Sequence, residues 1–237
     1  TVKSIAALKA GLGKTLMERI VDSKPEVVTL LDTQYRMNEE IMRFSSSWFY
    51  DGKVKAAPIT AHRGILDYDT PIEWVDDVAN DDETVGETFV GETFGRINKV
   101  EARQVMELLQ AYFEKIGKQR ILDESIDVGI ISPYRAQVQY LRHLIKKETF
   151  FKPFRHLLSV NTVDGFQGQE RDVIIVSLVR SNNDGQIGFL RDLRRMNVAM
   201  TRARSKLIII GDHETLAHHE FYKKLYEYIK KHKTDNF

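Results

Sequence analysis

The sequence predicts an α/β protein in which a mostly parallel central sheet is flanked by helices on both faces. Segments with strand character alternate with segments that carry apolar residues at helical spacing, and this alternation is typical of parallel sheets. The strand-like segments 173–179 and 207–210 are almost continuously apolar, which indicates burial on both faces. Polar motifs follow several of the strands. Because ligands bind at the carboxyl ends of parallel strands, these motifs are expected to share one site.

The first 25 residues are expected to be helical, and the β-branched and apolar residues of 26–30 predict the first strand. The same composition predicts further strands, which lie at 72–76, 126–131, 173–179 and 207–210, with one more just after 158. Apolar residues at helical spacing predict helices at 41–49, 100–116, 134–147, 190–203 and 214–231. The clearest is 100–116. Its apolar side consists of Val100, Val105, Leu108, Leu109 and Tyr112.

Length and composition restrict the class of protein. A chain of 237 residues with 42% apolar side chains can bury a full core. It shows neither an apolar run of about 20 residues nor a signal peptide, so membrane insertion and secretion have no support. It has no cysteine, which excludes disulfides and thiolate metal sites and fits a cytoplasmic protein. No metal site is expected, because the histidines lack metal-ligand spacing with carboxylates: His62, His143, His156, His218 and His219.

The formal net charge of +1 argues against a purely electrostatic binder of DNA, since such proteins carry a strong basic excess. The charge is unevenly distributed. Segment 67–92 is acidic and contains no Lys or Arg, whereas 191–204 and the tail 223–233 are basic. If the basic face carries the motifs, the acidic segment should point away from nucleic acid or towards another part of the protein.

One motif is Met-Asn-Val-Ala-Met-Thr-Arg-Ala-Arg at 196–204, a helical pattern that ends in arginines ahead of a strand. Such a helix end can direct a guanidinium at a phosphate, and Arg202 is the best placed. Taken alone, the same pattern also fits a basic helix end in solvent. Arg204 would lie off the Arg202 face of a helix, and it is either a plain surface charge or a capping charge for the core.

A second motif, Thr-Val-Asp-Gly-Phe-Gln-Gly-Gln-Glu at 162–170, joins two strands. Its glycines let the backbone approach a ligand, Thr162 offers a hydroxyl and an amide to a phosphate, and Glu170 offers a carboxylate to a ribose hydroxyl or a bound water. The alternative is a tight loop whose Asp and Gln side chains satisfy their own backbone.

Two further motifs are Gln-Tyr-Arg-Met at 34–37 and Ser-Pro-Tyr-Arg-Ala-Gln at 132–137. In this order, the four motifs resemble those of superfamily 1B helicases of the up-frameshift-like and immunoglobulin mu-binding-protein-like branch. The resemblance covers nearly the whole chain, and it implies the C-terminal RecA-like motor domain. On this basis, residues 1–237 would form a single domain, the second of the two motor domains. Within it, 1–25 would be a connecting helical segment and about 77–99 a variable acidic insertion. The tandem pentapeptides 85–89 and 90–94 are interpreted as a surface hairpin or part of that insertion.

The resemblance implies that Arg202 and Arg36 are arginine fingers, which reach across a cleft to ATP and its Mg²⁺. Both would be held mainly by an absent first domain. Glu170 would contact the ribose or phosphate region, with Gln167 and Gly168 shaping its loop. Tyr35 would either pack against the base or buttress its neighbouring arginine.

The same resemblance implies an ATP-dependent helicase whose partners are single-stranded DNA or RNA and the N-terminal RecA-like domain of the same protein. Ser132, Thr162 and neighbouring amides would hold backbone phosphates, which positions a strand without reading its sequence. Arg135 is a further candidate, although it fits a solvated helix start equally well.

The segment Gly-Leu-Gly-Lys-Thr at 11–15 imitates a phosphate-binding P-loop. A working loop needs a preceding buried strand and an earlier glycine, whereas position 8 is Leu and 4–10 has helical character. The isolated chain is therefore expected to lack ATP hydrolysis. Two other functions stay open: a non-catalytic module that binds single strands or a partner, and a small NTPase that uses Lys14.

Overall fold

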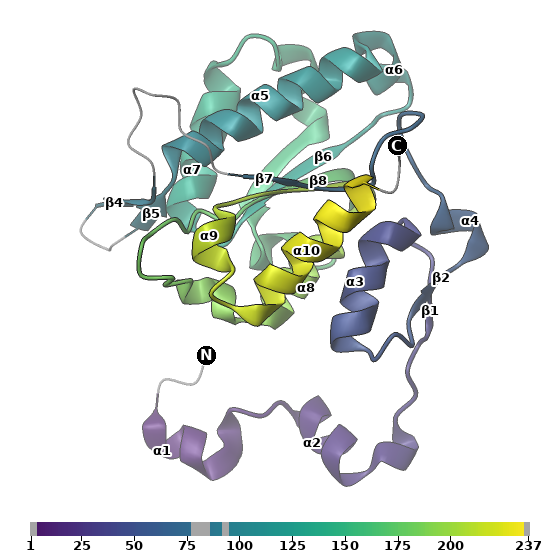
Figure 1. Ribbon diagram of the computed structural model, residues 1–237, viewed down its shortest axis with the longest axis vertical. Coiled ribbons are helices and arrows are strands. Elements are labelled where there is room, and N and C mark those ends of the chain that lie inside the picture. The colour runs from purple at the N-terminus through teal and green to yellow at the C-terminus, as the bar shows by residue number, and fades with distance from the viewer. Residues whose placement is uncertain (1–3, 77–85, 92–94, 235–237) are drawn as a thin grey trace. The chain divides into compact units, whose positions relative to one another are not determined.

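The computed structural model describes residues 4–76, 86–91 and 95–234. It comprises two units, which divide between Asp32 and Thr33 (Figure 1). The larger unit contains a sheet of five parallel strands in the order β3-β9-β8-β6-β7. These strands are β3 (Ile72–Val75), β6 (Val128–Ser132), β7 (Leu158–Thr162), β8 (Arg171–Ser177) and β9 (Ala203–Ile210). The predicted parallel α/β class is therefore confirmed.

Helices cover both faces of this sheet, and alternate residues of the central strands face the two layers. In β8, Ile174 and Val176 pack in one apolar cluster, while Val173 and Ile175 pack in the other. One layer holds α3 (Glu39–Phe49), α8 (Leu193–Met200) and α10 (Glu220–Thr234). The opposite layer holds α5 (Lys99–Ile116), α6 (Lys118–Asp123) and α7 (Arg135–Lys147) (Figure 1). The near-continuous apolar runs of the strands follow from this double coverage.

Shorter elements connect this framework. A parallel pair joins β1 (Thr33–Gln34) to β2 (Lys55–Ala56), followed by α4 (Pro58–Ala61). An antiparallel hairpin joins β4 (Thr88–Val90), which lies within the tandem pentapeptides, to β5 (Gly95–Ile97), which follows them, so the hairpin expected for 85–94 extends beyond that segment. Residues 77–85 and 92–94 of the acidic insertion lie outside the described residues. Short 3₁₀ turns occupy Lys152–Leu157, Asp164–Phe166 and Gly188–Arg191, and α9 is His213–Leu216.

Three predicted elements are corrected by the structure. Residues 26–30 form no strand: Pro25–Val27 is a 3₁₀ turn, and no strand in the described part of the chain pairs with this segment. The helix predicted for 190–203 ends at Met200, because Ala203 instead pairs with Arg171 in the sheet. The helix predicted for 214–231 is divided into α9 and α10. The second helix, α10, begins again at Glu220. Its rotation about its own axis buries four side chains: Phe221, Tyr222, Leu225 and Ile229.

The smaller unit contains α1 (Ile5–Ala7), a π-helical turn (Leu8–Leu12) and α2 (Leu16–Ser23). The helical character predicted for this segment is confirmed, while its role as a connector stays a prediction. Thr15 is the N-cap of α2: its side chain accepts from the N–H of Glu18, whose carboxylate accepts from the N–H of Thr15. Lys14 Nζ lies 2.5 Å from Asp22 Oδ2. Gly-Lys-Thr therefore starts a helix through a capping box, and no strand precedes it among the described residues.

The acidic segment is tied to the protein itself through a buried lysine. Lys206 of β9 has a side chain that is only 3% exposed, and its Nζ lies 2.7 Å from Asp69 Oδ1 and 2.6 Å from Glu73 Oε1. It also donates to the carbonyl of Thr70. Tyr112 of α5 donates to Asp69 Oδ2 at 2.7 Å, and burial, followed by this hydrogen bond, raises the pKa of its phenol. This network attaches the loop before β3 to the sheet and to α5.

Candidate active site

The Gln-Tyr-Arg-Met motif forms a turn that is organised by its glutamine. Gln34 Oε1 accepts from the N–H of Arg36 at 2.8 Å and from the N–H of Met37 at 2.7 Å, and Gln34 Nε2 donates to the Met37 carbonyl. Met37 is buried in the core, and Asn38 caps α3. Tyr35 is left 69% exposed. The turn therefore presents residues 35 and 36 at the surface while its other side chains hold the backbone.

The Arg36 side chain reaches two of the other three motifs at the amino-terminal edge of the sheet, where β8 and β9 begin. The expectation of one site shared by the motifs at the carboxyl ends of the strands is therefore wrong for this cluster. Its Nε donates to Glu170 Oε2 at 2.5 Å, and its Nη1 donates to the Thr201 carbonyl at 3.1 Å. The ion pair is partly exposed, with 35% of the Arg36 side chain and 41% of the Glu170 side chain accessible. The group is therefore both oriented by the protein and open to a ligand.

Arg202 lies in the tight turn between α8 and β9, and not on a helix. Its Nε donates to the Val198 carbonyl at 2.9 Å, Nη1 to the Gln169 carbonyl at 3.2 Å, and Nη2 to Thr201 Oγ1 at 3.2 Å. Burial, followed by the nearby charge of Arg36, lowers the pKa of the Arg202 guanidinium. Thr201 thus accepts hydrogen bonds from both arginines, from Arg36 through its carbonyl and from Arg202 through its hydroxyl. The two arginines that the motifs singled out therefore lie close together.

Glu170 lies among several arginines. Besides its contact with Arg36, its Oε1 is 3.8 Å from Arg204 Nη1. The hydrogen bond from Arg36 lowers the pKa of the Glu170 carboxyl below its ordinary value of 4.5. The charges of Arg36, Arg204 and Arg63 act in the same direction, while partial burial opposes them. The carboxylate therefore stays ionised and occupies an electropositive position where an anionic ligand would also be favoured.

We expect an NMR titration of Glu170 to give a midpoint below 4.5, and Arg36→Ala to return the midpoint towards that value. A carboxyl whose folded pKa is lowered stabilises the fold above its unfolded pKa, and it loses this contribution as the pH falls through the folded pKa. The pair is therefore intact at neutral pH and is lost only in the acid range below 4.5. The matched control is Arg43→Ala, on the exposed side of α3, which should leave the midpoint in place. An unchanged midpoint in Arg36→Ala would contradict the assignment of the shift.

Two arginines of the cluster were not predicted to take part. Arg204 lies in β9, so its expected helical position is wrong, and it pairs with Asp127 Oδ1 at 2.9 Å and Asp172 Oδ1 at 3.0 Å. Arg63 Nη1 donates to the Arg36 carbonyl at 3.0 Å. Arg63 does not directly follow a strand and belongs to none of the four motifs. Only its contact with Arg36, 27 positions away in the sequence, identifies it as part of the cluster.

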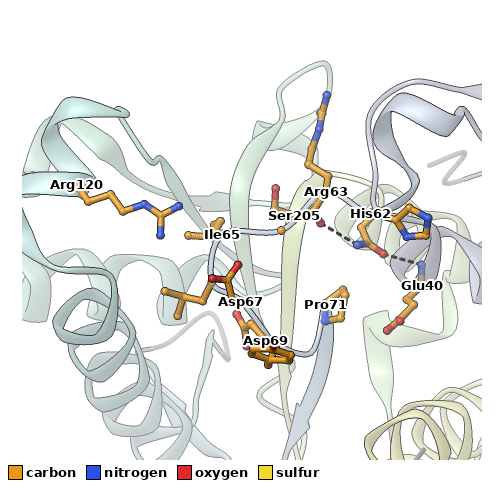
Figure 2. A pocket seen from close by; sticks show the side chains of 13 residues that line it. Glu40, His62, Arg63, Ile65, Asp67, Asp69, Pro71, Arg120 and Ser205 are labelled. Atoms are coloured by element: carbon orange, nitrogen blue, oxygen red, sulfur yellow. Dashed lines mark hydrogen bonds between the residues drawn. The ribbon is translucent and has the colours of Figure 1, made fainter. Parts of the chain in front are cut away.

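A cavity of about 530 Å³ lies beside this cluster, around the loop 62–71. Its lining carries both signs of charge, with Arg63 and Arg120 against Glu40, Asp67 and Asp69. Figure 2 shows that the Arg63 side chain points away from the loop carboxylates. The backbone carbonyl of Arg63 accepts a hydrogen bond from the side chain of Asn38 at 2.8 Å. Arg63 thus contacts Arg36, while the cavity itself is lined by three carboxylates and two guanidinium groups.

Side chains brace the 162–170 loop, and the alternative interpretation holds for Gln169 alone: its Nε2 donates to the Gly165 carbonyl at 3.1 Å, whereas Asp164 pairs with Arg195. Asn161 Oδ1 accepts from the N–H of Thr162 at 2.9 Å, and Thr162 Oγ1 accepts from the N–H of Gly165 at 3.4 Å. A Cβ at position 165 would overlap the amide of Asn161, so any larger residue there would displace a side chain that braces the loop. Gln167 and Gly168 are exposed, and Gly168 has a φ of +81°. The loop is thus rigid at its base and presents its tip to solvent.

The remaining predicted residues lie at the start of α7. Ser132 is fully buried, and its hydroxyl accepts from the N–H of Tyr134 at 3.4 Å. The structure therefore corrects the expectation of a direct phosphate contact for Ser132: it braces the turn instead. Arg135, the first residue of α7, is exposed. Within the described ranges there is neither a metal-binding group of three His, Cys, Asp or Glu residues nor a helix long and apolar enough to span a membrane.

Comparison with known proteins gives consistent matches. A family model described as an AAA domain (AAA_12) matches residues 12–214. An uncharacterized ATP-dependent helicase of Methanocaldococcus jannaschii is 37% identical over 228 residues, which are 92% of this chain and 32% of the relative. A regulator of nonsense transcripts 1 homolog of Neurospora crassa is 34% identical over 232 residues, 94% of this chain and 20% of the relative. The DNA-binding protein SMUBP-2 of Rattus norvegicus is 34% identical over 240 residues, 98% of this chain and 23% of the relative.

The chain therefore spans between 20% and 32% of the length of these relatives. The family match covers most of the chain and all four motifs. The motif side chains also meet in the structure, where the arginines of the first and last motifs both contact Thr201. The chain belongs to the AAA-domain family of up-frameshift-like superfamily 1B helicases, and it corresponds to their C-terminal RecA-like motor domain.

Proposed function

We propose that this domain supplies Arg202 and Arg36 to the γ-phosphate of ATP that a first RecA-like domain holds, within an ATP-dependent nucleic-acid helicase or translocase. The observation that carries the proposal is the convergence of both guanidinium groups on Thr201, beside an ionised carboxylate. Phosphoryl transfer needs positive charge where negative charge develops, and guanidinium groups fixed in advance provide it without reorganisation.

The residues of the cluster fit a phosphate. Arg202 is held by two backbone carbonyls, from Val198 and Gln169, so its charge is directed before a ligand arrives. Arg36 is held by one carbonyl and by Glu170. When ATP binds, Arg36 would exchange part of its contact with Glu170 for a contact with the phosphate, which carries more negative charge than a carboxylate. Glu170 would then remain near the ribose or phosphate region, while Mg²⁺ would be held mainly by the first domain and would neutralise phosphate charge there.

Tyr35 is proposed to pack against the nucleotide base. If Tyr35 were a buttress for Arg36, its ring would lie against Arg36 and would be largely covered. Tyr35 is instead 69% exposed. Arg36 is instead held through Gln34, Glu170 and Thr201, so no buttress is needed. Gln167 and Gly168 shape the loop that ends at Glu170.

The opposite side of the motif loops is proposed to hold the phosphates of single-stranded DNA or RNA. Thr162 and the neighbouring amides would contact the backbone, Arg135 would add a charge, and Ser132 would act only by bracing its turn. Opening and closing of the two domains would alternate this grip. The relatives fit either nucleic acid, since one is named a DNA-binding protein and another a regulator of nonsense transcripts.

We expect the chain by itself to show no ATP hydrolysis, with or without single strands, and Lys14→Ala to change nothing. The reason is that Lys14 is paired with Asp22 and Thr15 caps a helix, so the Gly-Lys-Thr segment has no cradle for a phosphate. Phosphate release is measured for the chain and for the longer protein that includes the preceding domain. Turnover by the chain that Lys14→Ala abolishes would replace this proposal with a self-contained NTPase.

A further inference from the structure

A groove of about 710 Å³ lies between the β4–β5 hairpin and the start of α7. Phe189 and Arg195 complete its lining on the third side. The groove borders the 162–170 loop, because Arg195 Nη2 is 3.3 Å from Asp164 Oδ2. It therefore adjoins the surface for which contacts to a single strand are proposed above.

An aromatic side chain is displayed in this groove. Phe189 is 64% exposed, and its ring lies 5.6 Å from that of Tyr134, which is buried. A partly supported ring with a free face is the usual platform for a nucleobase in proteins that bind single strands, because every base can stack on it.

The display of Phe189 is enforced by buried contacts. Gly188 has a φ of +54°, and a Cβ there would clash with the guanidinium of Arg180. Arg180 is buried and forms an ion pair with Glu87. The N–H of Glu87, just before β4, donates to the Ser181 carbonyl at 3.3 Å. One buried pair thus fixes both the turn that carries Phe189 and the hairpin wall opposite.

The groove also carries polar groups suited to a nucleotide. Arg135 and Gln139 lie one turn apart on α7 and both line the groove. The Arg135 side chain makes neither an ion pair nor a hydrogen bond with the described residues, so its charge is available to a phosphate. A glutamine amide can both donate to and accept from a base edge. Arg96, held by Glu87, adds positive charge on the hairpin side.

We propose that this groove binds one nucleobase of a single-stranded nucleic acid, stacked on Phe189, with an adjacent phosphate at Arg135. The inference rests on the proposed grip of a single strand and adds a base-binding position to it. The assigned contacts are to a base and a phosphate, and none is to a 2′-hydroxyl, so DNA and RNA should be bound alike at this position.

The test titrates the chain with three fluorescein-labelled 12-mers and follows their anisotropy: dT12, rU12 and an abasic deoxyribose strand with the same phosphates. Phe189→Ala should weaken binding of dT12 and rU12 by roughly 5- to 100-fold and leave the abasic strand unchanged, while Phe189→Trp should retain base binding. Arg135→Ala should weaken all three, because it removes a phosphate contact.

The matched control is Tyr68→Ala, which removes a fully exposed aromatic side chain that does not line the groove. It should leave all three affinities in place. An equal loss for the abasic strand in Phe189→Ala, or no loss for any strand, would overturn the stacking inference while leaving the phosphate grip standing. Failure of the unaltered chain to bind any of the three strands would overturn the phosphate grip and the stacking position together. Thermal unfolding of each variant verifies that the fold is retained.

Discussion

Replacing Arg202 or Arg36 by alanine is expected to lower kcat for ATP hydrolysis by about 10³- to 10⁵-fold in a protein that carries both motor domains. The two side chains are held in place by hydrogen bonds to backbone carbonyls. The neighbouring Arg204 is already paired with Asp127 and Asp172, so it is not expected to replace either of them. Binding of single strands should change little, because neither arginine belongs to the surface proposed to contact phosphates. The measurement is steady-state phosphate release at saturating single strand, beside anisotropy of the labelled strand.

Arg43→Ala provides the control, since it removes an exposed arginine of α3 that pairs with Glu39 one helical turn away. Its hydrolysis rate should match that of the unaltered protein. Arg36→Lys is a sharper variant. It keeps the charge but loses the planar group that contacts Glu170 through Nε and Thr201 through Nη1, so most activity should still be lost. Undiminished hydrolysis in both alanine variants would remove the arginine-finger assignment and favour a non-catalytic binding module.

Lys206→Met is expected to lower the free energy of unfolding by about 3 kcal/mol, because removing one partner of a buried ion pair leaves uncompensated charge. Its side chain is 3% exposed and contacts two carboxylates, whose own side chains are 18% and 29% exposed. This partial exposure lets water relieve some of the carboxylate charge, so the lower end of the usual range is expected. Urea unfolding should show a reduced midpoint with an unchanged slope.

The matched control is Lys224→Met. Lys224 also pairs with a glutamate, Glu227, but at 3.3 Å and with about half of each side chain exposed, 53% and 49%. Exposed pairs contribute roughly 0–1 kcal/mol, so the control should shift the midpoint little. Equal losses in the two variants would show that burial of Lys206 has no special weight, and that the loop before β3 is held by other contacts.

The order of strands and helices in the larger unit could be predicted because apolar spacing reports burial directly. The errors occurred where a tertiary contact decided the backbone. Residues 26–30 have strand composition but no pairing strand among the described residues, while Ala203 left the predicted helix because it pairs with Arg171. Ser132 was expected to contact a ligand, yet the sheet buries it completely. Neither the pairing partner of a strand nor the burial of a single polar side chain can be predicted from local composition.

By itself, the sequence determined the α/β class, the alternation of elements, and the membership of Arg36, Glu170 and Arg202 in family motifs. Only the tertiary structure decided that Arg36 meets Glu170 across 134 positions and that Arg63 and Arg204 join them. It also decided that Phe189 stands free beside Tyr134. The physical reason is that spacing along the chain sets which faces are buried, whereas strand order and turn geometry set which charged side chains from distant segments share one volume.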